Sequence, residues 1–212
     1  MTAPDSGELI VLVADKNMHD GLRGLLTRPK ALGIREIETR IFVHPRRDPA
    51  CVRESDAFLR PFVSQYEHAL VMFDRHGSGR EELLAGALAE QVRGRVAASG
   101  WGDRVEVIVL DPELETWVFA SSTQVERCLG WEAPGVSLRQ WLETRELWDH
   151  DKPKPTRPRE ALEQVLFEVR RPRSSSLYGD LGRRVSVRAC TDPAFIKLRE
   201  TLIRWFPREV AV

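Results

Sequence analysis

The stretch Leu9-Ile-Val-Leu-Val-Ala14 decides the fold class, because it is an unbroken run of apolar, mostly branched residues. A strand with one face in water alternates apolar and polar residues, whereas an unbroken run is typical of a strand buried on both faces of a parallel sheet. The residues that follow, Asn17–Thr27, place apolar side chains at helical spacing. The pattern therefore predicts a buried strand followed by a helix.

Outward from this stretch, the alternation of apolar run and helical pattern repeats. Three further apolar runs predict strands over Ile37–Val43, His68–Phe73 and Val105–Leu110. Helical spacing predicts helices over Glu54–Phe62 and Arg80–Ala98, and a third that begins at Asp111-Pro112 with Asp111 as its N-cap. Arg46–Pro49 is predicted to be a loop. Strands that alternate with helices predict an α/β fold with a small, mostly parallel sheet flanked by helices on both faces.

The texture of the chain changes after Gly130. Three tryptophans stand in a charged, broken region: Trp131, Trp141 and Trp148. Asp151–Arg159 holds three prolines and four basic residues, which predicts an extended segment. Two helices are predicted beyond it, over Glu160–Arg170 and from Asp192 onward, with a loop over 170–176. We therefore predict a core over residues 1–130 and a mainly helical appendage over residues 131–212 that packs on it.

Composition argues against several classes of protein. The 32 basic and 32 acidic residues cancel, which disfavours bulk electrostatic capture of nucleic acid or of a membrane surface. Cys51, Cys128 and Cys190 lie far apart, so neither a disulfide framework nor a zinc site is predicted. No apolar run approaches the roughly 20 residues of a membrane span, and the first residues do not resemble a secretion signal. We therefore expect a cytoplasmic protein without a membrane partner.

Chemistry is expected where the strands end, because ligands of an open parallel sheet bind beyond the carboxyl ends of its strands. The polar residues that follow the four predicted strands are Asp15, His44, Asp74 and Asp111, with Asp20 and Glu115 slightly further along. Carboxylates that meet at one edge suit Mg²⁺, which takes oxygen ligands. Four of these residues also have a structural alternative: a helix N-cap for Asp15 and Asp111, a turn for Asp74, and a first helical turn for Glu115.

The loop Asp74–Arg80 reads DRHGSGR and lies between a strand and a helix, where backbone N–H groups can hold phosphate. It lacks the GK[ST] of a Walker loop, so a flexible surface turn is the alternative. His76 in this loop is a candidate general acid or base. A second basic region could bind phosphate backbones or form solvated loops, and it comprises Lys152, Lys154, Arg157, Arg159, Arg170, Arg171, Arg173, Arg183 and Arg184.

Four short motifs occur in order along most of the chain: Val11–Leu22 (VLVADKNMHDGL), Val71–Asp74 (VMFD), Leu110–Trp117 (LDPELETW) and Asp192–Phe195 (DPAF). Together they resemble the small Toprim-like proteins of bacterial defence and mobile-element loci, a group that includes the RloB-type proteins. The resemblance implies a Toprim-like sheet with a Mg²⁺ site that acts on a phosphodiester. Active members carry a glutamate after the first strand and a DxD after the third. Here Asp15 and Asp20 stand in the first loop, and His76 replaces the second aspartate.

This resemblance implies an accessory protein of a bacterial anti-phage defence system with a weak Mg²⁺-dependent nuclease or phosphoryl-transfer site. Asp74 and Glu115 would hold the ion, Asp15 or Asp20 would complete its shell, and His76 or Arg80 would assist at the phosphate. The alternative is an inactive scaffold that binds other proteins of the same system through its tryptophan-rich second half. A third hypothesis is nucleic-acid binding by the basic residues between 152 and 184.

Overall fold

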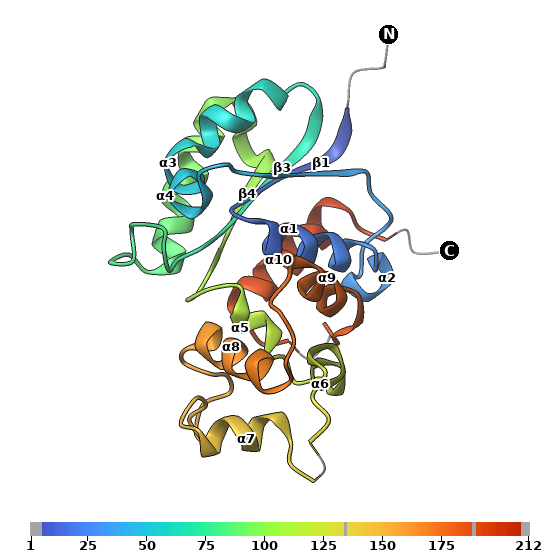
Figure 1. The fold of residues 1–212 in the computed structure, drawn as a ribbon. Helices are drawn as coiled ribbons and strands as arrows, with labels where there is room; N and C mark the ends of the chain where they lie inside the picture. The colour runs from blue at the N-terminus through green and yellow to red at the C-terminus, as the bar shows by residue number, and fades with distance from the viewer. Residues whose placement is uncertain (1–5, 134, 188–189, 209–212) are drawn as a thin grey trace.

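Four parallel strands form one sheet in the computed structural model, which describes residues 6–133, 135–187 and 190–208. The strands are β1 (Gly7–Val13), β2 (Thr39–Val43), β3 (Tyr66–Asp74) and β4 (Val105–Leu110). Their order across the sheet is β2-β1-β3-β4, and helices cover both faces (Figure 1). The predicted α/β fold with a small parallel sheet flanked by helices is confirmed.

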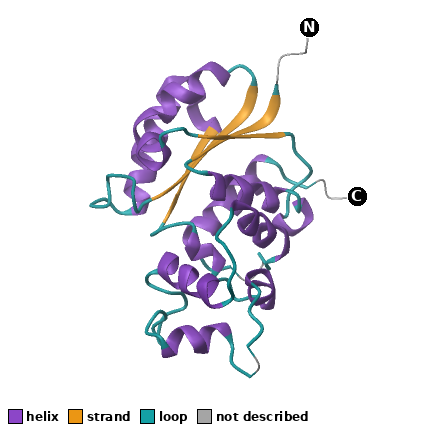
Figure 2. Ribbon diagram, in the orientation of Figure 1, coloured by secondary structure: helices purple, strands orange, loops and turns teal. Residues whose placement is uncertain are grey.

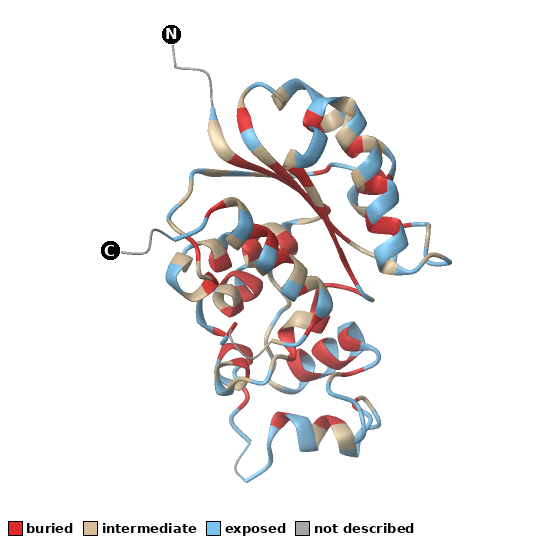
Figure 3. Cartoon of the chain, turned by 180° about the vertical axis from the view of Figure 1, so that it is seen from behind, coloured by how far each residue is buried: buried red, intermediate tan, exposed pale blue. Residues whose placement is uncertain are grey.

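The two central strands, β1 and β3, are buried on both faces, as their unbroken apolar runs predicted. In β1, Leu9–Val13 is completely buried, and the same holds for Ala69–Phe73 of β3. The register pairs Val11 with Ile41 on one side and with Leu70 on the other. Figure 3 shows this buried band along the strands and on the inward sides of the helices. Because all pairings are parallel, the carboxyl ends of the four strands meet at one edge.

Helices make up the rest of the regular structure (Figure 2). They are α1 (Lys16–Leu26), α2 (Pro29–Leu32), α3 (Arg47–Leu59), α4 (Ala85–Val96), α5 (Glu115–Val118), α6 (Thr123–Leu129), α7 (Leu138–Thr144), α8 (Pro158–Glu168), α9 (Ser175–Arg184) and α10 (Pro193–Trp205). Single turns cover Arg60–Phe62, Ala97–Trp101 and Gly102–Arg104. Helices α3 and α4 pack on one face of the sheet, and α1, α9 and α10 lie on the other side. Among the described helices, none combines the length and the apolar composition that crossing a membrane requires.

Three helix starts differ from the prediction. The loop predicted over Arg46–Pro49 is wrong, because α3 begins at Arg47 and accommodates Asp48 and Pro49 in its first turn. The helix predicted from Arg80 begins only at Ala85. The helix predicted from Asp111 is also wrong in its start: α5 begins at Glu115, and the Asp111 carboxylate binds Arg75 instead of capping a helix.

Helix α9 was not predicted at all, yet it forms the most extensive contact between two helices. It packs along α1 with glycine facing glycine: Gly24 lies against the backbone of Gly179, and Gly182 lies against the backbone of Gly21. A Cβ atom on Gly24 or Gly182 would come closer than 3.0 Å to backbone atoms of the other helix. Glycine disfavours helix formation in an isolated chain, which hid this helix from the sequence pattern.

The second half of the chain is helical as predicted, and parts of it belong to the main core. Helix α9 packs on α1, and α10 packs on β4. Arg28 at the end of α1 also donates hydrogen bonds to the carbonyl oxygens of Gly182 and Val185. A separate appendage after residue 130 is therefore not confirmed, and the division of the chain at that residue stays a prediction.

Candidate functional site

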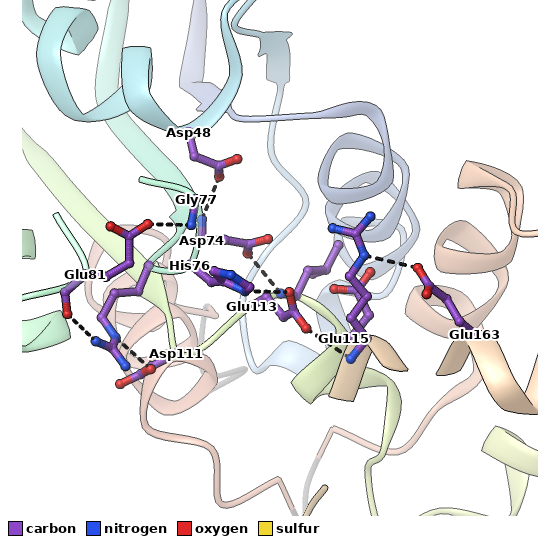
Figure 4. Close-up of polar contacts among 12 residues, drawn as sticks. Asp48, Asp74, His76, Gly77, Glu81, Asp111, Glu113, Glu115 and Glu163 are labelled. Atoms are coloured by element: carbon purple, nitrogen blue, oxygen red, sulfur yellow. Dashed lines mark hydrogen bonds and ion pairs between the residues drawn. The ribbon is translucent and has the colours of Figure 1, made fainter. Parts of the chain in front are cut away.

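Three aspartates from three different elements meet where β1 and β3 end. Asp74 is the last residue of β3, and its N–H donates to the carboxylate of Asp48 in the first turn of α3 at 2.8 Å. Asp15 follows β1 and caps α1 by accepting the N–H of Met18 at 2.8 Å, which confirms its N-cap role. The Asp74 carboxylate also accepts the N–H of Leu114 at 2.9 Å (Figure 4). We call Asp15, Asp48 and Asp74 the acidic edge.

Negative charge accumulates at the acidic edge. Burial raises the pKa of Asp74 well above its usual range, and the charges of Asp48, Glu115, Asp15 and Glu113 raise it further. Burial also raises the pKa of Asp48, and Asp15 adds to that shift. Among the described residues, no Lys, Arg or His forms an ion pair with any carboxylate of the acidic edge. The fold therefore holds these carboxylates close together, and the charge of Arg47 only partly offsets the upward shift in the pKa of Asp48.

Glu115 lies near the acidic edge but is neutralised by its own partners. Its side chain is only 3% exposed. One carboxylate oxygen accepts both the phenol O–H of Tyr178 on α9 and an N–H of the Arg173 guanidinium. Arg173 also pairs with Glu163 at 3.2 Å (Figure 4). Burial, followed by the charge of Glu115, raises the pKa of Tyr178, so the phenol remains a hydrogen-bond donor.

Glu113 joins the strand edge to α8. Its carboxylate accepts the N–H of Arg159 in the first turn of that helix at 3.0 Å, where the N-cap residue Arg157 supplies no side-chain bond. A carboxylate at a helix N-terminus is electrostatically favoured. The other oxygen of Glu113 lies 3.5 Å from Nδ1 of the exposed His76. Burial, followed by the charge of Glu115, raises the pKa of Glu113.

Asp20 contacts a different set of partners. Its carboxylate lies 2.9 Å from Nδ1 of His19 and 3.2 Å from the guanidinium of Arg23. Burial opposes ionisation of Asp20, but hydrogen bonds from His19 and Ser175 and the charge of Arg23 lower its pKa overall. The structure therefore brings Asp15 and Asp74 together, but Asp20 makes its polar contacts away from them.

The acidic edge has the donor atoms that Mg²⁺ prefers but not a finished metal site. In the described part of the chain, no three His, Cys, Asp or Glu side chains are placed to hold a metal ion as they stand. The predicted shell of Asp15, Asp20, Asp74 and Glu115 is thus not preassembled. The acidic edge nevertheless has the right donor chemistry, because Mg²⁺ binds hard oxygen ligands, keeps several waters and commonly uses only one or two carboxylates.

The remaining candidate residues have partners within the chain. Arg80 pairs with Glu82 at 2.6 Å. His44 is buried at the end of β2, where its Nδ1 accepts the N–H of Arg46 at 3.2 Å. The roles proposed for Arg80 and His76 at a phosphate remain predictions.

The basic region and the tryptophans are largely engaged in the fold. Lys154 donates to the carbonyl oxygen of Thr116 at 2.8 Å. Five further basic side chains of this region form ion pairs with Asp or Glu side chains of the chain: Lys152, Arg157, Arg159, Arg173 and Arg183. Trp131 and Trp148 are buried. The ion pairs of Lys152, Arg157, Arg159 and Arg183 lie at the surface, where such pairs contribute little, so nucleic-acid binding by this region stays a prediction.

Four residues of the site were missed by the sequence analysis: Asp48, Glu113, Arg173 as a partner of Glu115, and Tyr178. Glu113 stands within a quoted motif, so its distance of two residues from Glu115 was a usable signal. Asp48 was placed in a loop, and Tyr178 lies in the unpredicted α9. No signal in one sequence joins residues so far apart.

The fold and site together define an α/β protein with an acidic carboxyl edge. Comparison with known proteins adds no relative: no protein-family model matches the chain, and no curated protein or solved structure matches it significantly. The Toprim-like resemblance therefore remains a hypothesis, with the fold class as its only structural support.

Replacing Asp74 by asparagine is expected to raise the free energy of unfolding by about 1–2 kcal/mol at pH 7.5. Because the folded-state pKa of Asp74 is raised, wild-type stability falls as pH rises from near 3.8 through that raised value. Asparagine keeps the acceptor for Leu114 but carries no charge. The gain should therefore shrink towards pH 4. Urea unfolding at both pH values tests this, and a gain independent of pH would contradict it.

Proposed function

We propose that the acidic edge binds a divalent cation, Mg²⁺ or Mn²⁺, and that the bound ion receives a phosphate-containing substrate. One observation carries the proposal: Asp15, Asp48 and Asp74 come together at the carboxyl edge of a parallel sheet, where the charges of Asp48 and Asp15 help to raise the pKa of Asp74, and no cation of the described residues forms an ion pair with them. A divalent cation would relieve this repulsion, and ligands of such sheets bind at this edge.

In this proposal, each residue of the site has a separate role. Asp74, Asp48 and Asp15 would supply carboxylate oxygens to the ion, and their side chains would have to reorient to do so, because they are not placed to hold a metal as they stand. Glu115 would add negative charge from a position fixed by Arg173 and Tyr178. When bound, a divalent ion neutralises phosphate charge and activates water. His76 would stand beside the substrate, with its Nδ1 atom 3.5 Å from the carboxylate of Glu113.

The wider proposal is a Mg²⁺-dependent nuclease or phosphoryl-transfer protein that serves as an accessory component of bacterial anti-phage defence. Two things support it: the four-motif resemblance and an α/β sheet that carries acids at the expected edge. The resemblance also suggests partner proteins of the same defence system and a nucleic acid substrate.

Calorimetric titration with Mn²⁺ and Mg²⁺ tests the cation site. Wild-type protein is expected to bind with a stoichiometry near one, and Asp74→Asn is expected to lose at least about tenfold in affinity, since a ligand charge is removed. Asp180→Asn is the matched control, because it removes one carboxylate that is paired with Arg183 on the surface of α9. Equal affinity in all three proteins would refute the site.

One observation favours a second candidate function, an inactive scaffold or partner-binding subunit. Glu115 is bound by Arg173 and Tyr178, and Glu113 holds the first turn of α8, so both acids have structural roles. No cation binding by the wild type, together with a larger particle in size analysis with neighbouring gene products, would support this candidate.

A further inference from the structure

The loop between β3 and α4 binds a carboxylate of its own chain through backbone amides. Gly77 and Gly79 both have left-handed backbone conformations, with φ of +82° and +74°. One oxygen of Glu81 accepts the N–H of Gly77 at 2.8 Å (Figure 4). The same oxygen accepts the N–H of Gly79 at 3.2 Å. We call this pair of N–H groups the glycine nest.

A glycine nest of this kind can bind any anionic oxygen, whether a glutamate side chain or another group carries it. Main-chain N–H groups that converge in a turn form a concave site for an anionic oxygen, and phosphate oxygens are common occupants. The hydrogen bonds from its own N–H, from Gly79 and from Gly77 lower the pKa of Glu81. The loop therefore favours a negative charge at this point.

Two arginines of the same loop, Arg75 and Arg80, lie near the glycine nest in the sequence, and groups of the chain already bind both. Arg75 donates to Asp111 at 2.8 Å and to the backbone oxygen of Glu81 at 2.8 Å. His76, Gly77 and Glu81 are exposed, so a ligand in solution has access to the loop. A phosphate carries more charge and more acceptor oxygens than a carboxylate, which suits two amides flanked by arginines.

We propose that the glycine nest is a phosphate subsite that Glu81 occupies when no ligand is bound, and that a phosphoryl group displaces Glu81. The loop starts one residue after Asp74, so an anion in the nest would lie on the same side of the sheet as the acidic edge. As a substrate subsite, the inference rests on the proposed function. As an anion site, it needs no metal.

Titration of ¹⁵N-labelled protein with inorganic phosphate, at constant ionic strength and with a chelator present, tests the proposal. In Glu81→Ala, the amide signals of Gly77 and Gly79 are expected to shift saturably, with half-saturation at about one tenth of the wild-type concentration, because the competing carboxylate is gone. Glu82→Ala is the matched control, since Glu82 is also exposed and pairs with the Arg80 side chain rather than with the nest.

Glu81→Gln is a second test variant, for the case that Glu81→Ala changes the conformation of the loop. Glutamine keeps an acceptor oxygen for the two amides but carries no charge. The proposal is overturned if neither Glu81 variant shifts these two amides more readily than wild type, or if Glu82→Ala behaves like them. Asp74→Asn should keep its phosphate response while it loses cation binding. If the protein binds the cation but shows no phosphate response, only the phosphate-subsite proposal is refuted. If it shows the phosphate response but binds no cation, only the proposed function is refuted.

Discussion

Replacement of Gly24 by alanine is expected to lower the free energy of unfolding by about 3 kcal/mol, because the new methyl group has no room. Its Cβ would come within 3.0 Å of the backbone carbonyl of Gly179, and a main chain moves less readily than a flexible side chain. Helices α1 and α9 would have to separate, which would expose apolar residues between them. Urea unfolding followed by circular dichroism measures the loss.

Gly94→Ala is the control for this variant. Gly94 is an exposed residue inside α4, and a Cβ atom there meets no atom within 4 Å. Alanine should therefore stabilise the helix by about 0.5–1 kcal/mol, since it loses less conformational entropy on folding. If Gly24→Ala also proved neutral or stabilising, the close approach of α1 and α9 would be wrong.

Replacement of Arg173 by methionine is expected to cost about 3 kcal/mol, because it leaves the buried carboxylate of Glu115 with Tyr178 as its remaining polar partner. Methionine preserves much of the apolar stem of arginine, so lost packing contributes little. Glu163, on the exposed side of the same arginine, loses only a surface ion pair. Chemical unfolding at pH 7.5 gives the value.

A double-variant cycle assigns this loss to Glu115. Glu115→Gln in the Arg173→Met background should recover more than half of the stability, because the uncompensated charge is removed. Glu163→Gln in the same background should recover almost nothing. Strictly additive effects of the Arg173 and Glu115 substitutions would show that the two side chains are not coupled in the folded protein.

The sheet was predictable because the residue pattern of each central strand is enough to predict that the strand is buried. The unbroken apolar run of Leu9–Val13 requires burial on both faces, and that requirement needs no information from elsewhere in the chain. Predictions of helix starts failed where the local preference for an N-cap residue competed with contacts to residues elsewhere in the chain. Asp111 and Pro112 form a favourable helix start, but the carboxylate of Asp111 binds Arg75 from the neighbouring loop. Arg75 lies 36 positions before Asp111, so this contact could not be predicted from the local pattern.

The site was predictable only where it coincides with strand ends. Asp15 and Asp74 follow β1 and β3, so the topology of a parallel sheet is enough to bring them to one edge. Asp48 and Tyr178 enter from helices whose positions depend on packing. The Arg173–Glu115 contact joins residues 58 positions apart, and no periodicity in one sequence encodes such a pair.

The pairing of α1 with α9 has a consequence for synthesis of the chain on the ribosome. Arg28 finds its acceptor at Gly182, 154 residues further along. At about 5–20 residues per second, the apolar side of α1 waits roughly ten seconds or longer before α9 has been made. During that interval the nascent chain carries a finished strand next to an uncovered helix, which is the kind of surface that chaperones retain. Messages truncated between the codons for Leu110 and Arg184 would therefore yield products that quality control removes, even though the codons for all four strands had been translated.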